Sequence, residues 1–130
     1  MAHVIEIKVR FAETDMLGHV NNANYFIYME EARVNFFKSL FPEKRLSFVV
    51  ASVKCDFIQQ AFFDQWLRIQ TKVVKIGSKS FELAHEITDK NTGELIAKGH
   101  SVAVHFNYET QKSEQIPSEL RKKLEQAQHI

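Results

Sequence analysis

Residues 14–40 read TDMLGHVNNANYFIYMEEARVNFFKSL and contain the strongest helix pattern in the chain. From Ala23 to about Leu40 its apolar residues recur every three or four positions, as one face of an α-helix requires. The members of this stripe are Tyr25, Met29, Ala32, Phe36 and Leu40. Because further apolar residues widen the stripe, we expect a long helix that other elements wrap, with Asn21 or Asn22 as its N-cap.

Strand patterns lie on both sides of this helix. Apolar residues alternate with polar ones, the period of a half-buried strand, over residues 3–11, 46–60, 66–76, 80–88 and 94–107. After the last strand, Pro117 stands at the start of a short C-terminal helix. The sequence therefore predicts a single α+β domain over residues 1–130, in which a long antiparallel sheet of about five strands surrounds one central helix.

Composition excludes several classes of protein. Seventeen Lys and Arg balance sixteen Asp and Glu, and no dense basic run is present, so nucleic acid is not expected as a partner. Cys55 is the single cysteine, which rules out an intramolecular disulfide and a cage of thiolate metal ligands. The N-terminus does not resemble a signal peptide and no apolar run reaches membrane-spanning length, so we expect a cytoplasmic protein without a membrane span.

Other candidate reactive side chains carry no motif. His85, His100 and His105 lie on expected strands, but their separations match no short metal-binding pattern, and no metal site is predicted. Cys55 alternates with apolar neighbours, which indicates a packing thiol and not a nucleophile. A sheet curled around one helix also leaves strand edges and an outer face to protect, so we expect a homodimer or a homotetramer.

The loop before the long helix is the candidate site. Asp15 lies just upstream of a helix whose first free N–H groups and partial positive charge can stabilise an anion. Gly18, between the two, can adopt a positive φ and lets a substrate approach the backbone closely. A carboxylate and an anion site would therefore face each other here.

The order Asp, two residues, Gly-His-Val-Asn-Asn, two residues, Tyr and then Glu-Ala-Arg resembles the hotdog-fold acyl-CoA thioesterases of the 4-hydroxybenzoyl-CoA thioesterase type. The match is carried by Asp15, Gly18, His19, Val20, Asn21, Asn22, Tyr25, Glu31, Ala32 and Arg33. It continues through the strand order and IGSKSF at 76–81, so it covers essentially the whole domain. The resemblance implies the hotdog fold.

The resemblance also implies roles for particular residues. Asp15 would attack the thioester carbonyl or activate water to do so, while the backbone N–H of Asn22 would hold the developing oxyanion. His19 completes the candidate catalytic set. The candidate substrate-binding residues are Gly18, Tyr25, Ser78, Lys79 and Ser80. No metal or other cofactor is implied, since coenzyme A enters as part of the substrate.

The implied reaction is hydrolysis of an acyl-CoA to free acid and coenzyme A. Benzoyl-CoA-type members often have aromatic residues or histidine where this chain has Asn21 and Asn22, so the resemblance favours a fatty acyl group over an aromatic one. Two alternatives stay open: a thioesterase acting on acyl carrier protein, and a non-catalytic acyl-CoA binding module. A hydratase on the same fold would use a differently placed histidine.

Overall fold

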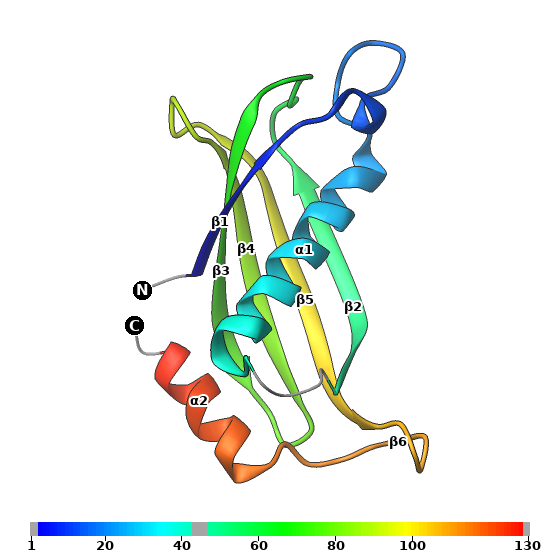
Figure 1. The fold of residues 1–130 in the computed structure, drawn as a ribbon, viewed down its shortest axis with the longest axis vertical. Helices are drawn as coiled ribbons and strands as arrows, with labels where there is room; N and C mark the ends of the chain where they lie inside the picture. The colour runs from blue at the N-terminus through cyan, green and yellow to red at the C-terminus, as the bar shows by residue number, and fades with distance from the viewer. Residues whose placement is uncertain (1–2, 43–46, 129–130) are drawn as a thin grey trace.

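The computed structural model describes residues 3–42 and 47–128 and is drawn in Figure 1. Its elements are β1 (His3–Lys8), a 3-10 helix (Phe11–Glu13), α1 (Asn22–Leu40), β2 (Phe48–Phe57), β3 (Trp66–Ile76), β4 (Ser80–Asp89), β5 (Leu95–Asn107), β6 (Lys112–Ser113) and α2 (Ser118–Gln128). One antiparallel sheet curls around α1, which confirms the expected hotdog fold.

The strand order of the sheet is β1-β3-β4-β5-β2, and the two-residue strand β6 pairs with the end of β5. Neighbouring strands are antiparallel throughout this order. The strands β3, β4 and β5 agree with the patterns at 66–76, 80–88 and 94–107 to within one residue. They form the middle of the sheet, so β1 and β2 are its two edges.

The helix α1 lies across the concave face of the sheet, and its apolar stripe builds the core (Figure 1). Near its start, Tyr25 and Met29 belong to a buried cluster that includes Ile69 of β3. Toward its end, Phe36 belongs to a second cluster with Leu124 of α2. Both clusters are built on the same helix. The packing of its apolar side chains therefore fixes where the N-terminus of α1 lies.

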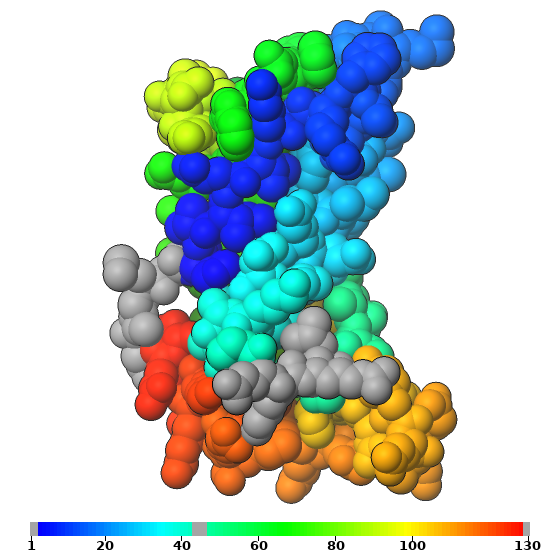
Figure 2. All heavy atoms as spheres, in the orientation of Figure 1, coloured from blue at the N-terminus to red at the C-terminus, as the bar shows by residue number. Residues whose placement is uncertain are grey.

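The side of α1 turned away from the sheet is open on the face shown in Figure 2. The helix carries exposed apolar side chains, with Ile27 55% and Phe26 36% accessible. The apolar surface of α1 is therefore only partly covered within one copy, because the sheet covers one face of the helix.

The first strand is shorter than the pattern over residues 3–11 predicted. Beyond Lys8 the chain leaves the sheet, since the Glu13 carboxylate accepts a hydrogen bond from the backbone N–H of Arg10 at 2.8 Å. This contact closes the 3-10 turn Phe11–Glu13. A polar side chain thus ends the strand where apolar alternation alone would continue it.

The strand β2 departs from simple alternation at a bulge between Val50 and Ser52. Simple alternation over residues 46–60 would put Val49 on the same face as Val53. In the structure Phe48 joins the core instead, with its ring centroid 5.1 Å from that of Phe37. The extra residue of a bulge shifts the alternation by one position. The start of the pattern at residue 46 lies outside the described residues.

Two further features bear on the sequence predictions. In the described ranges, no helix is long and apolar enough to cross a membrane. The expected C-terminal helix is present as α2, which buries Leu120 and Leu124 against the sheet.

A polar row crosses the buried face of the sheet beneath α1. The ring of His85 lies between two hydroxyl groups, with Nδ1 3.0 Å from Thr71 Oγ1 and Nε2 3.1 Å from Ser101 Oγ. Burial lowers the pKa of His85 to about 4, and the nearby charges of Arg33 and His100 add to the effect. His85 is therefore a neutral core residue.

We predict that His85 makes folding sensitive to acid. Its pKa rises from about 4 when folded to 6.5 when exposed, so the unfolded chain binds the proton first as the pH falls. The stabilisation that comes from keeping His85 neutral is complete above pH 6.5 and is lost toward pH 4. The free energy of unfolding should fall by about 3 kcal/mol across this range. Urea unfolding at pH 6.5 and pH 4 measures this change in the unchanged protein and in His85→Gln. The free energy of unfolding should depend less on pH in the variant. Parallel dependences would contradict this assignment.

A second prediction concerns Gly99, which lies directly beneath Met29. A Cβ atom at Gly99 would overlap the Met29 sulfur, so Gly99→Ala should destabilise the protein by about 1–3 kcal/mol. Met29→Ala removes that sulfur, and the double variant should lose less than the sum of the two single changes. Denaturant midpoints of the three variants measure this coupling, and strict additivity would disprove the contact.

Candidate active site

The loop that carries Asp15 connects the 3-10 helix to α1, and its two ends lie side by side. Its base is joined by a hydrogen bond from Asn21 N–H to Glu13 O at 2.9 Å and by a β-bridge between Thr14 and Val20. It is also tied to the chain before β3, because Val20 N–H donates to Ala61 O at 2.8 Å. The loop therefore has fixed ends at the start of α1.

Inside the loop, the Asp15 side chain is held by the backbone. Its Oδ1 accepts hydrogen bonds from Leu17 N–H at 2.8 Å and from His19 N–H at 3.1 Å. Gly18 adopts φ +81°, which an L side chain rarely adopts, and this conformation lets the chain turn around the carboxylate. Asp15 is exposed, and no described residue donates to its Oδ2. One carboxylate oxygen is thus anchored while the other is free to react.

The first turn of α1 presents an unused donor. Asn21 is the N-cap, and its side chain accepts a hydrogen bond from Ala23 N–H at 3.0 Å. Asn24 N–H donates to Asn21 O at 2.8 Å. The N–H of Asn22 bonds to no acceptor within the described part of the chain. The predicted oxyanion donor is therefore available at the positive end of a 19-residue helix.

A small cavity of about 110 Å³ opens beside this helix end. It is lined by Asn22, Tyr25, Phe57, Ile58, Gln59 and Gln60. Tyr25 is buried, and its hydroxyl accepts a hydrogen bond from Ala61 N–H at 3.2 Å. Its ring also packs edge-on against Phe57. Tyr25 therefore joins α1 to the end of β2 and forms part of an apolar wall next to Asn22.

His19 has a definite place in the loop, although a catalytic role for it stays a prediction. Its backbone N–H supports Asp15, and its ring packs edge-on against Phe62 with 5.0 Å between the ring centroids. These contacts pin the loop to the segment that precedes β3.

The predicted binding residues Ser78, Lys79 and Ser80 lie at the other end of the molecule. They occupy the turn from β3 to β4, beside α2 in Figure 1, whereas the Asp15 loop is near the start of β3. The 11 residues of β3 separate the two ends by roughly 30 Å. Asp15, Gly18 and His19 lie in the loop that leads into α1, and Asn22 and Tyr25 lie in the first turn of that helix. The turn at residues 78–80 is apart from all of them.

The turn is braced by the C-terminal part of the chain. Ser78 O accepts hydrogen bonds from Ile116 N–H at 2.9 Å and from the guanidinium of Arg121 at 3.1 Å. Lys79 O accepts one from His105 N–H at 2.8 Å. The Ser78 and Lys79 side chains remain exposed, so a rigid backbone presents them to solvent.

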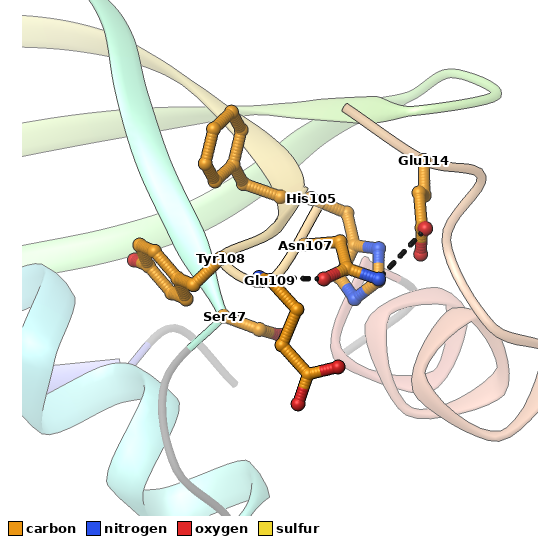
Figure 3. A pocket seen from close by; sticks show the side chains of 7 residues that line it. Ser47, His105, Asn107, Tyr108, Glu109 and Glu114 are labelled. Atoms are coloured by element: carbon orange, nitrogen blue, oxygen red, sulfur yellow. Dashed lines mark hydrogen bonds between the residues drawn. The ribbon is translucent and has the colours of Figure 1, made fainter. Parts of the chain in front are cut away.

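A larger hollow of about 400 Å³ lies near the same end, at the turn from β5 to β6 (Figure 3). Asn107 shapes it, because its amide nitrogen donates to Glu114 at 2.9 Å and its amide oxygen accepts from Glu109 N–H at 2.9 Å. Two carboxylates in its lining would repel phosphate, so we do not assign coenzyme A to this hollow.

Other nucleophiles and metal ligands give no competing site. Burial, aided by the neighbouring charge of Asp56, raises the pKa of Cys55 to about 11, which makes it a poor nucleophile. Among the described residues, no group of three or more His, Cys, Asp or Glu side chains is arranged to hold a metal ion.

Glu13 is a buried carboxylate two residues before Asp15, and no sequence pattern indicated a role for it. Its Oε1 accepts a hydrogen bond from the Tyr28 hydroxyl at 3.0 Å. Tyr28 lies 15 positions away, so no local spacing marks the pair. A charged residue in a short loop gave no signal that it would be buried.

Comparison with known proteins shows the family of the chain. Residues 9–124 match the thioesterase-like superfamily. The chain is 31% identical to the long-chain acyl-CoA thioesterase FadM of Escherichia coli, over 93% of this chain and 96% of that protein. It is also 40% identical to the uncharacterised protein YsmA of Bacillus subtilis, over 83% and 75% of the two chains.

A solved structure extends the likeness to three dimensions. A thioesterase from Thermus thermophilus, in complex with coenzyme A and zinc, superposes with a TM-score of 0.88 at 29% identity, covering 98% of this chain and 94% of that one. With its hotdog fold and the matched sequence, the chain is a thioester hydrolase. It belongs to the thioesterase-like superfamily.

The narrower resemblance to the 4-hydroxybenzoyl-CoA type is not confirmed. The relatives include proteins named for other substrates, such as the 1,4-dihydroxy-2-naphthoyl-CoA hydrolase of Nostoc punctiforme, which is 27% identical over 90% of this chain and 82% of that protein. The family is therefore shown, while the acyl group is not.

Proposed function

We propose that the chain hydrolyses acyl-CoA thioesters to a free acid and coenzyme A, with Asp15 as nucleophile or general base. One observation carries this proposal: two backbone N–H groups hold Asp15 by Oδ1 and leave Oδ2 free, on a loop that leads directly into α1. An asparagine could make the same two hydrogen bonds through its amide oxygen, so the carboxylate adds the charged free oxygen that the reaction requires.

The proposed chemistry has two routes. As a general base, Asp15 takes a proton from water while the water oxygen adds to the thioester carbonyl carbon, and the C–S bond then breaks to release the thiolate. As a nucleophile, Asp15 forms a mixed anhydride and expels the thiolate, and water then hydrolyses the anhydride. The Asn22 N–H stabilises the oxyanion in both routes, and neither needs a metal or another cofactor.

A fatty acyl group is the proposed substrate class. Three apolar side chains, Tyr25, Phe57 and Ile58, line the cavity beside Asn22 together with Gln59 and Gln60, and they would contact the first methylene groups of an aliphatic chain. The Escherichia coli relative is named for long-chain acyl-CoA, which supports the same assignment. Acyl carrier protein is the alternative donor, and a cytoplasmic location is part of the same proposal.

Replacing Asp15 tests the mechanism. We expect Asp15→Asn to lower thiol release from acyl-CoA by about a hundredfold or more, since the amide cannot act as base or nucleophile. Asp64→Asn is the matched control, because Asp64 is an exposed carboxylate at the same end of the molecule that pairs with Lys8. Thiol release is followed over short, long and aromatic acyl-CoAs. Equal turnover in Asp15→Asn and the unchanged protein would remove Asp15 from the mechanism.

We further propose a homodimer in which one copy supplies Asp15 and the other supplies Ser78, Lys79 and Ser80 to the same coenzyme A. Two observations support it: the 30 Å separation within one copy, roughly the length of β3, and the open edge of β2, where Val50 and Phe57 are exposed. Antiparallel pairing of two β2 edges would bring the turn of one copy to the Asp15 end of the other. A homotetramer would be a pair of such dimers.

Mixing two inactive variants tests the shared site. Asp15→Asn and Lys79→Glu should each lose turnover, whereas dimers re-formed from an equal mixture should regain about a quarter of the original activity, since half of them contain one intact site. Lys122→Glu, an exposed change on α2, is the charge control in place of Lys79→Glu. If the mixture stays as inactive as its components, the site does not span two copies.

A further inference from the structure

We infer that Glu13 is a positioning residue that fixes Asp15 opposite the N-terminus of α1. The inference rests on the proposed function of Asp15. It gives a role in the reaction to a carboxylate that no comparison assigns, and to its hydrogen-bond partner Tyr28.

Glu13 accepts hydrogen bonds from residues on both sides of the loop. Its Oε1 accepts hydrogen bonds from Arg10 N–H at 2.8 Å and from the Tyr28 hydroxyl at 3.0 Å. Its Oε2 accepts two more from the Arg10 guanidinium, at 3.2 Å and 3.1 Å. Its backbone O accepts the Asn21 N–H at 2.9 Å. One buried residue thus joins the chain before the loop, the chain after it and the body of α1.

These contacts link the two halves of the reaction centre. Asp15 is two residues after Glu13, and Asn22 directly follows Asn21, which is bonded to Glu13. Tyr28 is buried in the second turn of α1, where it belongs to the core cluster with Tyr25 and Met29. The hydrogen bond from the Tyr28 hydroxyl therefore fixes the base of the loop relative to the packed helix.

A carboxylate suits this place better than an amide. Four donors point at the two carboxylate oxygens of Glu13. An ionised carboxylate only accepts hydrogen bonds, whereas a glutamine would place an NH₂ group against some of these donors. Removing one partner from a buried charged group is costly. The Arg10 side chain is largely exposed, so the bond to Tyr28 is the buried part of this arrangement.

Kinetics provide the first test. Tyr28→Phe removes the contact to the helix, so kcat should fall about tenfold. Glu13→Gln disturbs all the side-chain contacts, so kcat should fall about a hundredfold, the effect expected when a reacting group is displaced by about 1 Å. KM should change by less than about threefold, because binding groups stay in place. Glu82→Gln, which removes a carboxylate paired with His100 on the outer face of the sheet, should leave kcat unchanged.

The same changes in an Asp15→Asn background separate positioning from general damage. If Glu13 acts through Asp15, Tyr28→Phe and Glu13→Gln should reduce the residual turnover by less than about twofold. An equal loss in both backgrounds, or no loss in kcat from either change, would overturn the inference.

A readout without substrate keeps the inference separate from the proposed function. Hydrogen exchange at the Leu17 and His19 amides, which donate to Asp15, should become about tenfold faster in Tyr28→Phe, while exchange at core amides such as Leu83 stays the same. Unchanged exchange at Leu17 and His19 would refute the positioning role. If no acyl-CoA releases thiol, the proposed function fails, and the exchange result still decides the role of Glu13.

Discussion

The packing of α1 on the concave face of the sheet organises both the core and the candidate site. The helix is buried through Tyr25, Met29 and Phe36, so its start cannot shift without disturbing the core. The start of the helix in turn sets the position of the free Asn22 N–H and of the loop that bears Asp15. The stability of the domain and the geometry of the site therefore draw on the same set of contacts.

Much of this fold was predictable because its patterns are local. The spacing of apolar residues located α1, and strict alternation located β3, β4 and β5. The errors arose where a single polar or extra residue overrides a pattern: Glu13 ends the first strand early, and the bulge in β2 brings Phe48 into the core. Neither effect leaves a periodic signal.

The site was predictable in part for the same reason. Asp15, Gly18 and Asn22 are close in sequence, and the structure places them in one loop and helix start. The separation of Ser78 and Lys79 from them could not be read from the sequence, since it depends on the direction of β3. The buried bond between Glu13 and Tyr28 depends on how the loop folds back on the helix, which no local spacing reveals.

A structure of the protein with an acyl-CoA analogue, in which a methylene group replaces the thioester sulfur, would show directly where the reacting carbonyl group binds. We predict that the carbonyl oxygen of the analogue lies within hydrogen-bond distance of Asn22 N–H, with the free carboxylate oxygen of Asp15 facing the carbonyl carbon. A carbonyl group bound away from both residues would contradict it.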